Sequence, residues 1–430
     1  MTVASQNGFA GTVTLATFVS PGNSLSCTLG VTAIVLSGSN PFGSSTLSCS
    51  GSSGVYSVTV TGTSGSLSHA TIVTYTVQDF SVSATPAAPV NAGVSTSSTV
   101  SVAAINGFSG TVSLSSSASP VGLTCSLSPA TLVLTSSTTS ASSTLSCIGS
   151  AGVYTVAVTG TLTGTSAILS RSSVLAITIQ DFSINANPSP VSMIAGSQAS
   201  STISASGLNG FTGTVSFTST VSSPLLACTI SPTSISLPSS ATSSLSCSGA
   251  SGVYTVIVTG SSGSLTHPAI ITFTVQDFAI SGPGTVTAQS GVSSPSTLTV
   301  ASQNGYTGVV SLTSTVSPSG GLVCSLTPTS VTLGNSGTST LSCSGSVGTY
   351  TVSVSGTSSG LTRTTTVTYT VTDYSVTANP TSVSTVAGTT APSTITVASI
   401  NGFTGSLGLS ASVSPSSGLT CSLTPTSLTL

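Results

Sequence analysis

Charged side chains are almost absent from this sequence. Its 430 residues contain two Lys+Arg and four Asp+Glu, with no Lys and no Glu, whereas roughly a quarter of the residues in a soluble domain are usually charged. Proteins bind nucleic acids through clusters of Lys and Arg that release counterions from the phosphates, and the basic residues here are Arg171 and Arg363 alone. The composition therefore argues against nucleic acid as a partner.

Long hydrophobic runs are missing as well. No window approaches the ~18 uninterrupted apolar residues of a bilayer span, so we expect no membrane span in this segment. Val, Ile and Leu instead alternate with Ser and Thr, as at residues 155–159. Alternation with period two is typical of strands with one buried face, and it distinguishes the chain from a disordered polar tract. A secretion signal begins with a charged segment followed by an apolar segment, and Met1 is not followed by such a sequence. We therefore expect any secretion signal to lie outside this sequence.

Side chains that perform catalysis or bind metals are few and far apart. A nucleophilic Ser needs an oriented base, but the two His residues, His69 and His267, occupy equivalent positions in different repeats. One Asp per repeat provides neither paired catalytic carboxylates nor the oxygen ligands of a calcium site. We expect no enzymatic activity, no metal and no cofactor. Asn-x-Ser/Thr acceptors are absent, which leaves O-glycans on the abundant Ser and Thr as the expected form of any glycosylation.

Internal repetition is the strongest signal that is present. An Asn-Gly-aromatic motif recurs at steps of 99, 103, 95 and 97 residues, beginning at Asn7, Asn106, Asn209, Asn304 and Asn401. A second motif marks the boundaries: Gln78-Asp79-Phe80, Gln180-Asp181-Phe182, Gln276-Asp277-Phe278 and Thr372-Asp373-Tyr374. These motifs predict three complete repeats (79–180, 181–276 and 277–372), a partial repeat 1–78 that lacks its first strands, and a partial repeat 373–430 that lacks its last strands.

Each complete repeat has the pattern of a small β-sandwich. In repeat 79–180, short alternating segments are separated by Gly, Pro, Ser and Asn turn residues. The predicted strands lie near 81–84, 99–103, 111–115, 123–127, 131–134, 143–147, 153–159 and 174–179, which makes seven or eight strands. Asn106-Gly107 suits a tight turn, because both residues tolerate a positive φ. No segment shows a helical period.

One tyrosine motif connects the repeats to a known family. Gly152-Val153-Tyr154 recurs around Tyr56, Tyr254 and Tyr350, and a Tyr that opens the penultimate strand resembles the tyrosine corner of immunoglobulin-type sandwiches. The whole repeat resembles the tandem immunoglobulin-like repeats of bacterial and archaeal cell-surface and secreted proteins. That resemblance implies an all-β chain of tandem immunoglobulin-like β-sandwich domains arranged as beads on a string. Such repeats serve as stalks, spacers, filaments or adhesin arms.

Nine cysteines at regular positions indicate an oxidising compartment. Each complete repeat has one Cys before a (Ser/Thr)-(Leu/Ile)-(Ser/Thr)-Pro segment and another that ends a (Ser/Thr)-Leu-Ser-Cys strand. The simplest pairing is within repeats: Cys27 with Cys49, Cys125 with Cys147, Cys228 with Cys247, and Cys324 with Cys343. Two thiols without a nearby His do not complete a zinc site. Cys421 has no partner in this segment, and its partner is expected 19 to 22 residues further on or in a neighbouring chain.

The few charges are placed once per repeat, at the junctions. All four acids follow the boundary residue: Asp79, Asp181, Asp277 and Asp373. The basic or titratable side chains His69, Arg171, His267 and Arg363 lie ten residues earlier, about 33 Å away along one strand and thus at the opposite pole of a domain. Across a junction we hypothesise the pairs Asp79 with Arg171, Asp181 with His267 and Asp277 with Arg363, which would orient neighbouring domains. The alternative is that Asp accepts backbone hydrogen bonds in a turn while the basic residues are solvated.

Taken together, the residues predict an extracellular structural protein that forms a fibre, filament or stalk on the cell surface. Low net charge favours self-association into filaments or bundles. The partial repeats at both ends fit either a window from a longer array or a filament subunit completed by strands from its neighbours. An adhesin arm or binding module, and spacer domains of a larger secreted protein, are the alternative functions.

Overall fold

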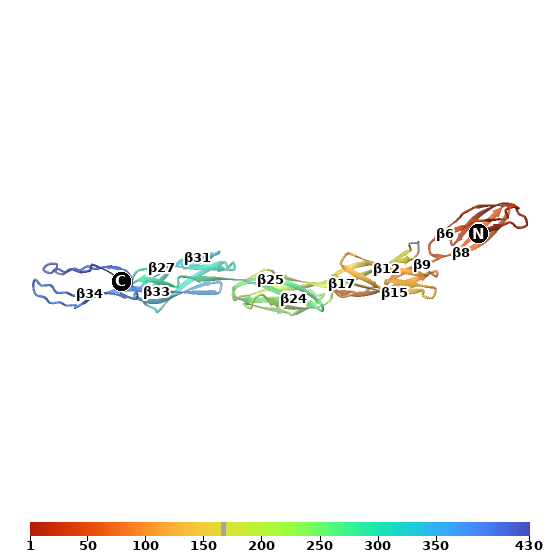
Figure 1. Ribbon diagram of the computed structural model, residues 1–430. Helices are drawn as coiled ribbons and strands as arrows, with labels where there is room; N and C mark the ends of the chain where they lie inside the picture. The colour runs from red at the N-terminus through yellow and green to blue at the C-terminus, as the bar shows by residue number, and fades with distance from the viewer. Residues whose placement is uncertain (165–168) are drawn as a thin grey trace.

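The computed structural model describes residues 1–164 and 169–430, and every regular element in them is a β-strand. The strands form five successive units that follow one another in a row, with the N-terminal unit at one end and the last unit at the other (Figure 1). The units are called unit 1 (1–78), unit 2 (79–180), unit 3 (181–276), unit 4 (277–372) and unit 5 (373–430). The all-β, tandem immunoglobulin-like class is confirmed. Since the described residues contain no helix, they contain none long and apolar enough to cross a membrane.

Unit 2 is a sandwich of two sheets. One sheet has the order β13-β15-β11-β9, and the other runs β14-β12-β16-β17 with β10 added parallel to β17. The strands are β9 (Asp79–Ala84), β10 (Val90–Asn91), β11 (Thr96–Ile105), β12 (Gly110–Ser119), β13 (Leu123–Ser128), β14 (Thr131–Leu134), β15 (Ser140–Gly149), β16 (Gly152–Thr163) and β17 (Ser170–Asn187).

Alternation places one face of each strand in the core. In β16, Tyr154, Val156 and Val158 are buried, whereas Val153 before them and Thr155 between them are exposed. Neighbouring side chains of a strand point to opposite faces of its sheet, so a Thr-Val-Thr-Val sequence supplies one apolar and one hydroxyl face. The same alternation in both sheets closes a continuous core inside unit 2.

Units 3 and 4 repeat this arrangement. Unit 3 consists of the second half of β17 with β18 (Val191–Ile194), β19 (Gln198–Leu208), β20 (Gly213–Val221), β21 (Leu226–Ser231), β22 (Ser234–Leu237), β23 (Thr242–Gly249), β24 (Gly252–Ser262) and β25 (Leu265–Ser281). Unit 4 continues with β26 (Thr285–Gln289), β27 (Ser294–Gln303), β28 (Gly308–Ser317), β29 (Leu322–Thr327), β30 (Ser330–Leu333), β31 (Ser336–Gly345), β32 (Gly348–Ser358) and β33 (Leu361–Asn379).

The predicted count of seven or eight strands per sandwich is too low. The described part of each complete unit has nine, because a short strand (β10, β18 or β26) pairs in parallel with the last strand of the same unit. Val90–Asn91 in β10 is only two residues long, too short to show an alternation in the sequence. The other eight strands coincide with the predicted positions but extend further at their ends.

The end units contain part of this strand set. Unit 1 has β1 (Thr2–Ala4), β2 (Gly11–Ser20), β3 (Leu25–Leu29), β4 (Ala33–Leu36), β5 (Phe42–Ser44), β6 (Leu47–Gly51), β7 (Gly54–Ser64) and β8 (Leu67–Val77). Unit 5 has the end of β33 with β34 (Thr394–Ile400), β35 (Ser406–Gly408) and β36 (Ser427–Thr429).

Four disulfides join the predicted cysteine pairs: Cys27–Cys49, Cys125–Cys147, Cys228–Cys247 and Cys324–Cys343. In unit 2 the two cysteines lie directly opposite each other on β13 and β15, with their Cα atoms 4.1 Å apart. Each bridge therefore joins neighbouring strands of one sheet, unlike the bridge between sheets of antibody domains. It attaches the edge strand β13, which pairs on one side only, to the sheet interior. Cys421 is exposed and unpaired in the described residues.

The tyrosine corner forms in the units that contain the motif. The Tyr154 hydroxyl donates to the Ser150 carbonyl oxygen at 2.9 Å, and Tyr254 donates to Ala250 at the same distance. Tyr56 and Tyr350 make the equivalent bonds to Ser52 and Ser346. Each bond fastens the turn that precedes the penultimate strand, four residues upstream of the ring.

Candidate functional site

The junctions between units gather nearly all of the chemically distinctive side chains. At three of them, one strand belongs to both neighbours: β17, β25 and β33 run without a break from the last strand of one sandwich into the first strand of the next. In β17, Ile179 still pairs with Gly152 of unit 2, whereas Asp181 pairs with Leu208 of unit 3. Only Gln180 separates the two partners. The beads therefore have no linker between them.

The partner strand changes at the boundary residue of every junction. Antiparallel pairing with the preceding unit ends at Val77, Ile179, Val275 and Val371, and pairing with the following unit begins two residues later at the four Asp residues. At the last three junctions the residue between them pairs in parallel with β10, β18 or β26 of the preceding unit. These positions coincide with the unit limits 78, 180, 276 and 372 expected from the sequence motifs. A β-strand spans about 3.3 Å per residue, so the backbone of the shared strand is the shortest mechanical connection between two cores.

The hypothesised acid–base pairs form, but each lies inside one unit. Arg171 Nη2 is 2.5 Å from Asp79 Oδ2, and Arg363 Nη2 is 2.6 Å from Asp277 Oδ2. Asp79 is the first residue of β9, and Arg171 lies near the start of β17 in the other sheet of the same sandwich. The prediction that these pairs orient neighbouring domains is therefore wrong. They connect the two sheets of one unit at its N-terminal pole.

The third pair uses histidine in place of arginine. His267 Nε2 lies 2.7 Å from Asp181 Oδ1, and its ring meets the edge of Phe182 with a centroid distance of 4.8 Å. A neutral imidazole makes this contact as a hydrogen bond, and a protonated one makes it as an ion pair. The ring replaces a guanidinium that, in units 2 and 4, donates to its Asp through both Nε and Nη2.

Of the alternative interpretation of the Asp residues, only the backbone hydrogen bond is found, because all four Asp residues lie within strands and not in turns. Each Asp accepts a hydrogen bond from the backbone N–H of the aromatic residue that follows it, at 2.7 to 2.8 Å. Asp79 and Asp277 are buried, and in both Oδ1 accepts this bond while Oδ2 meets the Arg side chain. In Asp181, Oδ1 makes both contacts. Asp373 retains the backbone bond, but no basic partner contacts it within the residues that the structure describes.

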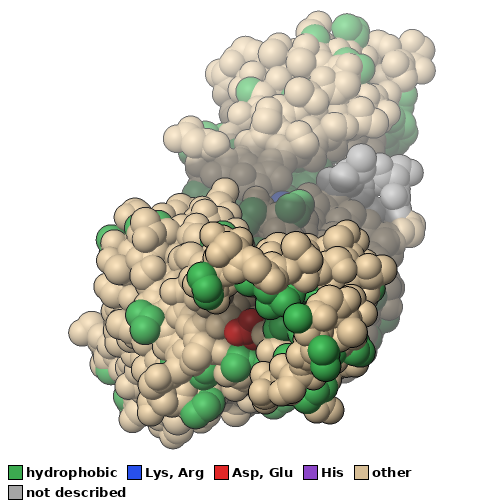
Figure 2. Space-filling model, turned by 90° about the vertical axis from the view of Figure 1, so that its left-hand side faces the viewer, with side chains coloured by type: hydrophobic (Ala, Val, Ile, Leu, Met, Phe, Trp, Pro, Cys, Tyr) green, Lys and Arg blue, Asp and Glu red, His purple; other side chains and the backbone are tan. Residues whose placement is uncertain are grey.

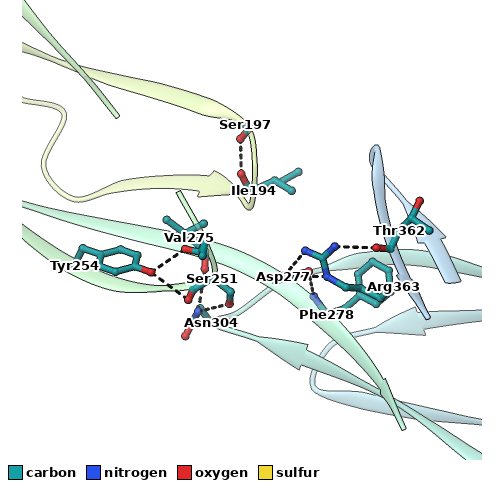
Figure 3. Close-up of polar contacts among 11 residues, drawn as sticks. Ile194, Ser197, Ser251, Tyr254, Val275, Asp277, Phe278, Asn304, Thr362 and Arg363 are labelled. Atoms are coloured by element: carbon teal, nitrogen blue, oxygen red, sulfur yellow. Dashed lines mark hydrogen bonds and ion pairs between the residues drawn. The ribbon is translucent and has the colours of Figure 1, made fainter. Parts of the chain in front are cut away.

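Contacts between units come instead from the amide side chains of the two repeat motifs, which were not predicted to cross the junction. Asn304 Nδ2 in the turn of unit 4 donates to the Val275 carbonyl of unit 3 at 2.9 Å and to Ser251 Oγ at 3.0 Å (Figure 3). In return, Gln276 Nε2 donates to the Gly305 carbonyl at 3.1 Å. We call this reciprocal pair of contacts the amide clasp.

The amide clasp recurs along the row. Asn106 and Asn209 donate to the Val77 and Ile179 carbonyls at 3.0 Å, and Gln78 and Gln180 donate to Gly107 and Gly210 at 2.9 Å. At the last junction Thr372 replaces the Gln, and Asn401 donates to both Val371 and Gly348. Each Asn donates to the carbonyl of the last residue in the antiparallel pairing with the preceding unit, at the point where the strand changes partners.

The Asn side chain reaches back because of the backbone conformation of its turn. Asn304 has φ +52° and Gly305 has φ +78°, the left-handed conformations that Asn and Gly adopt most readily. The Asn-Gly motif was correctly predicted as a turn, but its second role was missed. Every repeat has this Asn, and nearly every boundary has a Gln. The joint recurrence of the two amides is the feature of the sequence that could have indicated a contact between them and the neighbouring unit.

The molecular surface offers little chemistry outside these junctions. Viewed along the row from the end of unit 5, it consists almost wholly of uncharged side chains, with a small acidic patch inside a hollow (Figure 2). No cluster of His, Cys, Asp or Glu that could hold a metal ion occurs in residues 1–164 and 169–430. His69 and His267 lie in different units.

Comparisons with known proteins give structural likeness at low identity. No family model matches the chain, and no curated protein matches its sequence. An Escherichia coli alpha-2-macroglobulin activated by porcine elastase is 13% identical with a TM-score of 0.24, covering 86% of this chain and 42% of that chain. The D00-D0 domain of intimin is 18% identical with a TM-score of 0.28, covering 44% and 99%.

A three-domain titin structure, I67–I69, is 10% identical with a TM-score of 0.27 and covers 68% of this chain and 95% of its own. The present chain therefore spans less than half the length of the macroglobulin that it resembles. The assignment of a tandem immunoglobulin-like architecture rests on the strand order and pairing described above.

Proposed function

We propose that this chain is an extracellular structural protein, a length of a cell-surface fibre, filament or stalk built from disulfide-stapled immunoglobulin-like units, and that it has no catalytic role. The observation that carries the proposal is the shared strand at the junctions. β17, β25 and β33 each belong to two sandwiches, so force applied along the row passes from core to core through a hydrogen-bonded backbone.

The amide clasps support a mechanical role over that of a flexible tether. In a tether of beads, linker residues between domains allow each unit to rotate. Here a single boundary residue separates the two pairings, and Asn304 and Gln276 join its two sides by reciprocal hydrogen bonds. Bending at the junction would break these bonds and leave the Val275 carbonyl without its partner.

The covalent chemistry supports an extracellular location. Four disulfides are present, one in each of units 1 to 4, and disulfides persist in oxidising surroundings outside the cytosol. The surface is made of Ser and Thr hydroxyls with few ions, which keeps its charge nearly constant with pH. Such a surface lacks the repulsion that holds charged proteins apart, and we propose self-association into filaments or bundles, with O-glycans as an additional surface layer.

Labelling the intact source cells tests the proposal. Antibodies raised against units 2 to 4 are applied to unbroken cells and to lysed cells, and both are imaged by electron microscopy with gold labels. We expect label on unbroken cells, distributed along thin filaments. Label that appears only after lysis would contradict the extracellular role, and label confined to filament tips would favour the adhesin arm.

The mass of the native polypeptide separates the remaining alternatives. Mass spectrometry of the protein released from the cell surface compares its size with the 41.3 kDa of this chain. A much larger polypeptide made of further similar repeats supports the fibre or stalk. A larger polypeptide with a catalytic domain would show that these units are spacers of a secreted enzyme and would overturn the proposal.

A further inference from the structure

Gly follows Asn in this chain only in the Asn-Gly-aromatic motif, whereas every other Asn precedes Ser, Ala or Pro. Asn is among the chemically labile residues of proteins, and it loses its side-chain amide most readily before Gly. Gly has no side chain to hinder attack by its own backbone nitrogen. The turns that form the amide clasps therefore contain the Asn side chains most prone to deamidation.

Deamidation of Asn-Gly proceeds in two steps and consumes only water. The backbone nitrogen of Gly gives up its proton to solvent and attacks Cγ of the Asn side chain. A bond from that nitrogen to Cγ forms, the bond from Cγ to Nδ2 breaks, and Nδ2 takes a proton from solvent and leaves as ammonia. Water then opens the cyclic succinimide to Asp or to isoaspartate, in which the main chain continues through the side-chain carboxyl carbon.

The closed junction holds the leaving group of this reaction. Asn304 Nδ2 donates to the Val275 carbonyl at 2.9 Å and to Ser251 Oγ at 3.0 Å (Figure 3). A side-chain amide has two N–H donors, and both are directed to acceptors of the preceding unit. Attack on Cγ requires the side chain to rotate toward the nitrogen of its own Gly, so these bonds must break before the reaction can begin.

Gln276 restrains the other reactant. Its Nε2 donates to the Gly305 carbonyl at 3.1 Å, and a Cβ atom added to Gly305 would lie 3.8 Å from the same Nε2. The Gly305 N–H makes no hydrogen bond in the part of the chain that the structure describes, and Asn304 is exposed. Water therefore reaches both reactants, and they are kept apart by the turn conformation and the clasp.

The first two junctions hold their reactants in the same way. Asn106 and Asn209 each donate Nδ2 to a carbonyl of the preceding unit at 3.0 Å. A Cβ atom added to the following Gly would lie 3.8 Å from Nε2 of Gln78 and 3.6 Å from Nε2 of Gln180, respectively. The labile amide is thus bound to the neighbouring unit at three successive junctions.

Deamidation would convert the donor of a clasp into an acceptor. A carboxylate at position 304 has no N–H for the Val275 carbonyl, and two oxygen acceptors without a proton between them repel each other. Isoaspartate also adds one atom to the main chain of the turn. A junction modified in this way cannot form the clasp again.

We propose that the clasp residues Asn106, Asn209 and Asn304 are spontaneous deamidation sites that the closed junction protects and the open junction exposes. The rate at each site is then the fraction of time that its junction is open, multiplied by the rate of the free Asn-Gly sequence, by analogy with hydrogen exchange. Each event loosens one junction irreversibly and adds one negative charge to a chain of net charge −2. The inference rests on the geometry of the junctions and not on the proposed location at the cell surface.

Peptide mapping of the full chain measures these rates. The chain is incubated in mildly alkaline buffer, reduced and digested with pepsin in acid, which suppresses new succinimide formation, and the peptides are analysed by mass spectrometry. Synthetic peptides of residues 104–109, 207–212 and 302–307 give the rates of the free sequences. We expect each site in the folded chain to react at least about tenfold more slowly than its peptide, since the hydrogen bonds of a clasp must break first.

A double variant opens one clasp without altering its Asn-Gly sequence. Ser251→Ala with Gln276→Ala removes one acceptor of Asn304 and the side chain that fastens the Gly carbonyl. We expect deamidation at Asn304 to become about fivefold faster or more, because two hydrogen bonds no longer oppose opening. The rates at Asn106 and Asn209, measured in the same molecules, should not change.

The control variant is Gln289→Ala with Ser290→Ala, which removes the same kinds of side chain at the other pole of unit 4 and should leave the rate at Asn304 unchanged. Unfolding of unit 3 would also release Asn209, so the rate at that site distinguishes local opening from loss of the fold. Equal rates in the folded chain and in the free peptides would overturn the proposal. An unchanged rate at Asn304 in the double variant would also overturn it.

Separation by charge tests the structural consequence. Anion exchange resolves the deamidated molecules, because each event adds one charge to a chain that has very few. We expect the deamidated fraction to show a wider distribution of angles between neighbouring units in electron micrographs than the unreacted fraction. Identical distributions would contradict irreversible loosening of the junctions. Neither result bears on cellular location, which the labelling experiment decides.

Discussion

Asn304, in the turn between β27 and β28 of unit 4, donates its side-chain amide at 2.9 Å to the carbonyl of Val275 in β25, the last strand of unit 3. We predict that Asn304→Gly removes this contact while retaining the positive φ of the turn. The distribution of angles between units 3 and 4 should widen in electron micrographs, while the stability of either unit falls by no more than about 1.5 kcal/mol.

Asn40, between β4 and β5 of unit 1, provides the control, because Asn40→Gly removes an amide from a turn that belongs to neither unit 3 nor unit 4. The control should leave the angle distribution unchanged. Equal distributions for Asn304→Gly and the unchanged chain would show that the amide clasp has no part in aligning the units.

The ion pair between Asp79 and Arg171 should stabilise unit 2 itself. Arg171→Met leaves a buried carboxylate with only the Phe80 N–H as a partner, and we expect a loss of about 1–3 kcal/mol in the unfolding free energy of unit 2. Asp79→Asn combined with Arg171→Met should cost less than the sum of the single changes. Hydrogen exchange measured unit by unit in the full chain gives these energies, and strictly additive costs would argue against coupling.

Removing one disulfide should weaken one unit. Cys228→Ala with Cys247→Ala opens a loop of sequence separation 19 in unit 3, and chain entropy predicts a loss of about 3 kcal/mol. Pulse proteolysis with thermolysin should detect earlier cleavage inside 181–276 and an unchanged response in units 2 and 4. Cys421→Ala, which alters an exposed unpaired thiol, is the control and should change neither.

Unit 4 should be the unit most sensitive to alkali. Burial raises the pKa of the Tyr369 phenol above its ordinary value, and a hydrogen bond with Ser296 opposes this effect in part. The folded state therefore binds the phenol proton of Tyr369 more tightly than the unfolded state does. The stability that this proton gives to unit 4 is fully present below pH 10 and is lost as the pH rises through the pKa of Tyr369 in the folded state.

The prediction is tested by unfolding unit 4 between pH 9 and 12, with Tyr369→Phe as the matched variant. Unit 3 has Phe273 on the corresponding strand. The Tyr369→Phe substitution should therefore make the stability of unit 4 as insensitive to alkaline pH as that of unit 3. A parallel decline of both units with pH, unchanged by the substitution, would be inconsistent with a role for Tyr369.

The alternating sequence was sufficient to predict most of the fold. The Thr-Val pattern around Tyr154 placed a strand in the right position, and the recurring Gln-Asp-Phe motif placed the boundaries where the strands change partners. Cysteines at equal positions in each repeat gave the pairs that the structure joins. These features are local or periodic, so a single chain displays them directly.

The missing parts depend on contacts between distant segments. Asn106-Gly107 already had a local explanation as a turn, and nothing near it in the sequence shows that its amide reaches Val77 of the preceding unit. The acid–base partners were predicted correctly, but their location was not, because the pairs were expected to cross a junction, whereas both members belong to one unit.

Single-molecule stretching of the full chain tests most directly the claim that the units are independent, disulfide-closed sandwiches loaded in line. We predict separate unfolding events for units 2, 3 and 4. Reduction of the disulfides should increase the extension gained in each event by about 7 nm, because the 19 to 22 residues enclosed by each disulfide are then released at about 3.6 Å per residue. A single event for the whole chain, or extensions that do not change on reduction, would contradict this account.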